Sequence, residues 1–225
     1  RLIVVILMLL ALVATGCSSQ TTAKRELVSG DPYSDTQFLM GTVVTIKIYD
    51  KGKQGALDAA FSRVQQLADE LTVNQKGSEV DAVNKNAGMK PVHVTPSVYR
   101  VIEAAKHYSE NSNGSFDLAI GPITSLWHIG FADARKPAQS EIDAKLPLVH
   151  YQDVVLNKKQ QTVYLKKKGM AIDLGGIAKG FITDEVVKTL KKQHVTTAII
   201  DLGGNIFVMG KSPKSSKKDW SVGIQ

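Results

Sequence analysis

The sequence has a single cysteine, Cys17, among its 225 residues. One cysteine cannot form an internal disulfide, so an ordinary hydrophobic core must hold the fold together. The five histidines stand at positions 93, 107, 128, 150 and 194, and this scatter shows no metal-ligand spacing. The glycine-containing stretch 173–180 lacks the GK[ST] ending of a phosphate-binding loop and the glycine pattern of dinucleotide-binding folds. Disulfide scaffolds and the two common nucleotide loops are therefore excluded as explanations.

The charge is predominantly of one sign, with a formal net charge of +7. Lysine runs at 166–168, 191–192 and 211–218 carry much of this excess. These runs lack interleaved aromatic residues, which a nucleic-acid surface would supply for stacking. The pattern predicts a solvated surface that faces an anionic cell envelope, and no nucleic-acid partner.

The N-terminus predicts where the protein works. Residues 1–16 are almost wholly apolar, are short for a membrane span, and end in small residues before Cys17. This pattern resembles a bacterial lipoprotein signal peptide, with Cys17 as the lipidated residue. Residues 17–36 are then expected to form a flexible tether, and 37–225 the folded domain. The predicted location is the extracytoplasmic face of the cell membrane, through a lipid anchor.

Strand and helix signals alternate from residue 37 to 209. Val44, Ile46 and Ile48 alternate with polar residues as in a half-buried strand, whereas apolar residues of 54–71 recur on one helical face. Ser78 and Thr95 stand as N-cap residues of two further helices. Strands are predicted at 37–49, 91–94, 154–156, 162–165, 170–172, 197–202 and 205–209, and helices at 54–71, 78–88, 95–114 and 177–192. The predicted class is α+β, with a mixed sheet covered by helices.

The segment from Met170 to Gly180 is the best candidate for a ligand site. Asp173-Leu174-Gly175-Gly176 precedes a predicted helix, and backbone N–H groups at such a corner favour an anion. The same four residue types recur at 201–204 after a second predicted strand, which favours a ligand at the ends of neighbouring strands. The alternative is that Asp-Leu-Gly-Gly is a common turn composition and recurs by chance.

A third candidate lies at Ser115-Phe116-Asp117 and continues through Gly121-Pro122 to Trp127. It combines a carboxylate, a glycine turn and two aromatic rings. Phe116 and Trp127 would stack on a planar ligand, or else belong to the core.

These motifs, in this order, resemble those of the FAD:protein FMN transferases, the ApbE-like flavin transferases. The resemblance covers the chain from Met40 onward, and the stretch 126–131 is most similar to the Gram-positive, lipid-anchored branch. The motifs are Met40-Gly41-Thr42, Ser78-Glu79-Val80 before Asn84, Phe116-Asp117 to Gly121-Pro122, Leu126-Trp127, DLGGIAKG at 173–180, DLGGNIFVMG at 201–210, and a strand at 220–224.

The resemblance implies the ApbE-like fold and a Mg²⁺-dependent transfer of FMN from FAD to a Ser or Thr hydroxyl of an acceptor flavoprotein. AMP is the implied leaving group. By motif position, Met40 packs at the flavin site, which Ser115, Phe116 and Asp117 line. Asp173 would contact FAD, the Gly176 carbonyl would bind Mg²⁺, and Lys179 would lie near the nucleotide.

The sequence departs from the family pattern in two places. Asn74 stands where many members carry a flavin-stacking tyrosine. The Asp and Thr or Ser expected to complete the Mg²⁺ site would lie beyond Gln225, so the 37–225 domain is expected to be C-terminally incomplete and the catalytic residues stay unknown. Two alternative functions use the same site: an FAD pyrophosphatase, or a non-catalytic lipoprotein that binds flavin or another solute.

Overall fold

The computed structural model describes residues 26–73, 76–214 and 219–223. The predicted signal peptide, Cys17 and Asn74 lie outside these residues. Within them, four strands form one antiparallel sheet in the order β1-β2-β6-β7. Their bounds are Tyr33–Leu39, Thr42–Ile48, Ala198–Leu202 and Asn205–Met209.

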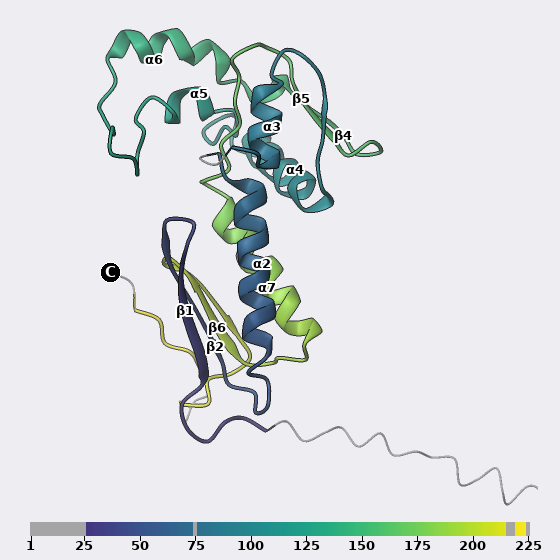
Figure 1. Ribbon diagram of the computed structural model, residues 1–225, viewed down its shortest axis with the longest axis vertical. Coiled ribbons are helices and arrows are strands. Elements are labelled where there is room, and N and C mark those ends of the chain that lie inside the picture. The colour runs from purple at the N-terminus through teal and green to yellow at the C-terminus, as the bar shows by residue number, and fades with distance from the viewer. Residues whose placement is uncertain (1–25, 74–75, 215–218, 224–225) are drawn as a thin grey trace, which may run out of the picture.

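A second antiparallel sheet has the order β3-β5-β4, with bounds Val92–His93, Thr162–Leu165 and Val154–Asn157. Two long helices, α2 (Ala56–Leu71) and α7 (Ala178–Lys192), run side by side from the first sheet toward the second (Figure 1). The remaining helices are α3 (Glu79–Lys85), α4 (Pro96–Asn111), α5 (Gly121–Thr124) and α6 (Gln139–Lys145), with 3-10 turns η1 (Leu146–Leu148) and η2 (Tyr151–Asp153).

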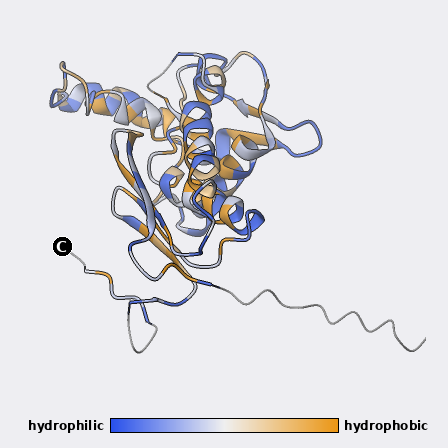
Figure 2. Cartoon of the chain, turned by 60° about the horizontal axis from the view of Figure 1, so that its bottom comes forward, coloured by the Kyte–Doolittle hydropathy of each residue, from blue (hydrophilic) through white to orange (hydrophobic). Residues whose placement is uncertain are grey.

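One hydrophobic core runs through both sheets and the helices between them. Val44, Ile46 and Ile48 of β2 are fully buried, and their register partners on β6 point to the same side. The buried apolar residues of helix α2 belong to the same core, while most of its other positions are polar. Figure 2 shows the resulting mixture of hydrophobic and hydrophilic positions along the helices. Apolar residues that recur every second position in the strand and every third or fourth position in the helix therefore form this core, as the sequence predicts.

A buried carboxylate fixes α7 to its neighbours. Glu185 accepts hydrogen bonds from Arg63 of α2 at 2.6 Å and from Lys188 at 2.8 Å, and Arg100 of α4 lies 3.3 Å away. Burial raises the pKa of Glu185, but the hydrogen bonds from Lys188 and Arg63 outweigh it and lower the pKa to about 2. The ionised carboxylate thus joins α2, α4 and α7.

The α+β class is confirmed, with two differences in detail. The strands form two antiparallel sheets where one mixed sheet is expected. The folded part also begins earlier than residue 37: β1 starts at Tyr33, and Leu27 forms a bridge with Asp50. Alternation is weak in β1, because five of its seven residues are exposed, and the single strand predicted at 37–49 is in fact the end of β1, a turn at Met40-Gly41 and β2. No helix among the described residues is long and apolar enough to cross a membrane.

Candidate functional site

The residues before the first Asp-Leu-Gly-Gly corner do not form the predicted strand at 170–172, although Met170 and Ile172 are buried. The partner of Ile172 is a side chain: Asn84 of α3 accepts from the Ile172 N–H at 2.8 Å and donates to the Ile172 carbonyl at 3.0 Å. On the other side, Gly121 donates to the Ala171 carbonyl at 3.1 Å, and Asp173 donates to the Leu118 carbonyl at 2.9 Å. The backbone groups of residues 171–173 are therefore satisfied by the Asn84 side chain and by residues 118 and 121, and not by neighbouring strands.

Asp173 stands at the corner itself, with each carboxylate oxygen held by one donor. The Gly175 N–H donates to Oδ1 at 2.9 Å, and the Thr124 hydroxyl donates to Oδ2 at 2.7 Å. Gly175 and Gly176 are exposed, and α7 starts two residues after them. The N–H groups of Ile177 and Ala178 already donate to the Leu174 carbonyl, at 2.9 and 2.7 Å, but the positive end of the helix dipole lies at this corner. The corner therefore combines a fixed carboxylate with a helix end that suits an anion.

Phe116 lies against this corner. A Cβ at Gly176 would stand 3.1 Å from Cε2 of the Phe116 ring, so the ring contacts backbone that only glycine leaves open. Both oxygens of Asp117 accept backbone N–H groups, from Ala119 at 2.7 Å and Tyr151 at 3.0 Å, and its expected place at the flavin site stays a prediction. Asp117 anchors the loop, and Ser115 is exposed at the loop's start.

Two hairpin tips from the first sheet meet at one end. The β6–β7 turn passes so close to β2 that a Cβ at Gly203, which has φ +60°, would stand 2.1 Å from Oγ1 of Thr42. Asn205, the first residue of β7, donates to the Thr183 hydroxyl of α7 at 3.3 Å. Thr183 in turn donates to the Lys179 carbonyl at 2.8 Å, in the first turn of α7. The second Asp-Leu-Gly-Gly corner is thereby connected to the helix that follows the first.

Met40 and Gly41 form the other tip, between β1 and β2. Both have positive φ, +55° and +70°, which is the backbone of a two-residue hairpin turn that normally prefers Asn or Gly at its first position. A methionine there costs about 1 kcal/mol. Strain of this kind is found at functional sites, and the ligand-contacting role of Met40 stays a prediction.

The structure therefore brings most of the predicted residues to one region, the N-terminal junction of α7. We use this name for the corner at 173–176, Phe116, the first turn of α7 with Lys179, and the hairpin tips at Met40 and Gly203. Lys179 is exposed there and forms no ion pair with another described residue. Sequence reasoning missed Thr124 and the hydrogen bonds of Asn84, because no spacing rule reveals which distant segments meet.

The magnesium ion implied by the resemblance finds few donors in this region. Among residues 26–73, 76–214 and 219–223, no three or more His, Cys, Asp or Glu side chains group together as a metal site. At the first corner the oxygens include the Asp173 carboxylate, the Thr124 hydroxyl that is bonded to it, and the Gly176 carbonyl. They do not make up the octahedral shell that Mg²⁺ demands.

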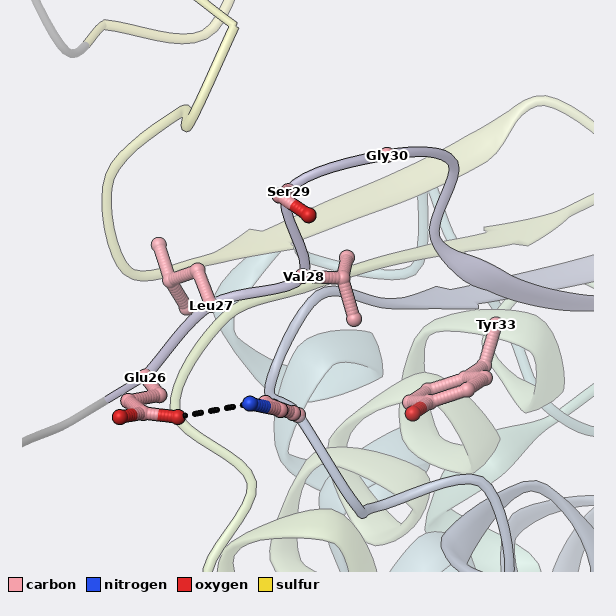
Figure 3. Close-up of a pocket in the computed structure, with 7 residues that line it drawn as sticks. Glu26, Leu27, Val28, Ser29, Gly30 and Tyr33 are labelled. Atoms are coloured by element: carbon pink, nitrogen blue, oxygen red, sulfur yellow. Dashed lines mark hydrogen bonds and ion pairs between the residues drawn. The ribbon is translucent and has the colours of Figure 1, made fainter.

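A hollow of about 470 Å³ lies elsewhere, beside the start of β1 (Figure 3). Glu26, Ser29 and Tyr33 line it, and Lys51 pairs with Glu26 at 3.0 Å. Tyr33 and Met40 stand at opposite ends of β1, about 20 Å apart at the rise of an extended strand. This hollow is therefore separate from the junction.

Residues 40–225 match the family model described as the ApbE family. The FAD:protein FMN transferase of Klebsiella pneumoniae (strain 342) is 37% identical over 193 residues, which are 86% of this chain and 58% of that protein. The enzyme of the same name from Treponema pallidum (strain Nichols) is 34% identical over 208 residues, with the same coverage. The chain thus spans about three fifths of the length of these relatives.

Solved structures have the same fold. The crystal structure of the ApbE protein from Thermotoga maritima superposes with a TM-score of 0.74 at 26% identity, covering 80% of this chain and 60% of that one. The apo flavinyl transferase ApbE of Pseudomonas stutzeri gives a TM-score of 0.75 at 22% identity, covering 89% and 66%. The expected fold is therefore confirmed, while the assignment to a Gram-positive branch stays a prediction.

Proposed function

This chain belongs to the ApbE family, and on that premise we propose that the whole protein is an FAD:protein FMN transferase. In the proposed reaction a Ser or Thr hydroxyl of an acceptor protein attacks the flavin-side phosphorus of FAD. The new P–O bond forms as the P–O bond to AMP breaks, and the hydroxyl proton passes to a base. FMN stays on the acceptor as a phosphoester.

The observation that carries the proposal is the N-terminal junction of α7. Phe116 and Gly176 are in contact there, and the glycine corner precedes a 15-residue helix whose first turn carries Lys179. A diphosphate needs its negative charge offset and its geometry held, and helix N–H groups with a lysine suit that need. An aromatic ring beside them suits a flavin.

We include Mg²⁺ in the proposal because the family resemblance implies it. The described residues contribute few of its ligands, so the rest would come from residues outside the junction.

The proposal also places the protein on the extracytoplasmic face of the cell membrane, attached through a lipid on Cys17. Mass spectrometry of the protein extracted from membranes, with and without Cys17→Ser, tests the anchor.

The transfer reaction is tested on the full-length mature protein with FAD, Mg²⁺ and an acceptor domain that carries a Thr or Ser site. AMP release together with an FMN-sized mass gain on the acceptor, lost on adding EDTA, is the expected result. AMP without a mass gain on any acceptor tried would favour the pyrophosphatase. Intact FAD throughout would favour a flavin-binding protein and contradict the proposal.

A further inference from the structure

The Asp173 side chain has little freedom left once its backbone is fixed. Asn84 holds the preceding residue, Ile172, at both its N–H and its carbonyl, and the Asp173 N–H itself donates to Leu118. With the backbone of Asp173 held in this way, the remaining motion is rotation of its carboxylate group. Among the described residues, two donors limit that rotation, the Gly175 N–H and the Thr124 hydroxyl.

These two donors differ in kind. The Gly175 bond closes a local turn two residues long, which any aspartate before a glycine corner can form. The Thr124 bond comes from 49 positions away in the sequence and is the shorter of the two, at 2.7 Å against 2.9 Å. A hydroxyl that donates to a carboxylate forms a stronger bond than one that donates to a neutral carbonyl. The same hydroxyl also lies 3.3 Å from the Gly121 carbonyl, and the shorter, charge-assisted bond takes its single proton.

We propose that Thr124 is a positioning residue for FAD, which orients the Asp173 carboxylate and keeps its outer lone pairs turned toward the nucleotide. This inference rests on the proposed function, because it assumes that Asp173 contacts FAD. Thr124 ends α5, in the segment that also carries Phe116, whereas Asp173 begins the corner that carries Gly176. The Thr124 bond therefore adds a side-chain link between these two segments to the backbone bonds that Gly121 and Asp173 donate.

Three variants of the full-length protein test the proposal. Thr124→Val keeps the branched shape and removes the hydroxyl, and Thr124→Ser keeps the hydroxyl. Ser125→Ala is the matched control, since that neighbouring hydroxyl donates to the Pro122 carbonyl at 3.2 Å. FAD affinity is measured by flavin fluorescence, KM and kcat by AMP release, and folding by the thermal midpoint.

We expect Thr124→Val to weaken FAD binding about tenfold and to raise KM with kcat nearly unchanged, as for a lost ground-state contact. Thr124→Ser and Ser125→Ala should bind FAD like the wild type, and all four thermal midpoints should agree. Wild-type affinity in Thr124→Val, or equal losses in Thr124→Val and Ser125→Ala, would overturn the proposal. A wild-type protein that binds FAD but transfers no FMN would contradict the proposed function alone, because the affinities would still report on Thr124. A wild-type protein that does not bind FAD would overturn both.

Discussion

Asn84 pairs with Ile172 as a strand would, through both a donated and an accepted hydrogen bond. The two residues lie 88 positions apart, on α3 and on the segment that leads into the glycine corner. An asparagine amide matches the spacing of a backbone N–H and carbonyl, so it satisfies two buried polar groups at once. Asn84 therefore fixes the residue immediately before Asp173.

The first prediction concerns this pair. Asn84→Ala should lower the free energy of unfolding by about 2–3 kcal/mol, because it leaves two backbone groups without partners. Asn86→Ala, which removes one side-chain bond to the Ala82 carbonyl, is the control and should cost about 1 kcal/mol or less. Urea unfolding measures both. If both variants lost the same free energy of unfolding, the pairing of Asn84 with Ile172 would stabilise the fold no more than an ordinary side-chain hydrogen bond.

Stability in acid should depend on Glu185. Its pKa of about 2 in the folded state lies below the ordinary value of 4.5, so its stabilisation is complete above about pH 4.5 and is lost as pH falls toward 2. Glu185→Gln should cost on the order of 3 kcal/mol at pH 7 and flatten the loss of stability between pH 4.5 and 2.

Glu141→Gln is the control for that prediction. Hydrogen bonds from Arg135 and from the Ala138 N–H lower the pKa of Glu141 to about 2 as well, but the pair lies on the surface. Solvent screens such pairs, so this variant should change stability little. Thermal midpoints measured from pH 2 to 7 compare the two, and an acid profile for Glu185→Gln identical to that of the wild type would contradict the assignment.

A third prediction separates steric contact from backbone strain at the β6–β7 turn. Gly203 and Gly204 both have positive φ, but a Cβ at Gly203 would overlap Thr42, whereas nothing lies within 4 Å of one at Gly204. Gly204→Ala should cost about 1 kcal/mol, the price of the left-handed conformation alone. Gly203→Ala should cost at least about 2 kcal/mol more, since it forces the hairpin tips apart. Chemical denaturation of both variants checks this, and equal costs would mean that the turn yields freely.

Lys179 should contribute charge to nucleotide binding. Lys179→Ala is expected to weaken FAD affinity about tenfold at low salt, and less at high salt, because screening already removes part of the attraction. Lys192→Ala removes an exposed lysine at the other end of the same helix and should leave affinity unchanged. Fluorescence titrations at two salt concentrations measure the effect. If both variants lost the same FAD affinity, the effect would come from the net charge of the protein and not from the position of Lys179.

Local signals in the sequence predicted much of the fold. Ser78 caps α3 by accepting from the Asp81 N–H at 2.9 Å, and Pro96 opens α4 after Thr95, as their residue types indicate. The strand at 170–172 was wrong, because apolar composition indicates burial but not which partner satisfies the backbone. The split into two sheets depends on long-range pairings such as Val44 with Leu202, which no local pattern specifies.

Some features of the candidate site could likewise be predicted from the sequence, and others could not. The carboxylate and glycines of the corner predicted Asp173 and Gly176, and the family resemblance implied Lys179; the structure brings Phe116 to the same place. The anchoring of Asp117 by two backbone donors was not predictable, since the Tyr151 N–H comes from a distant turn. The same limit applies to the Thr124 bond, which requires α5 and the glycine corner to be packed together.

The most direct test of the central claim is the structure of the full-length protein with bound FAD. We expect the diphosphate at residues 173–179, at the N-terminal end of α7, with the isoalloxazine ring near Met40 and Phe116. FAD in the hollow beside Tyr33, with the N-terminal junction of α7 empty, would contradict it.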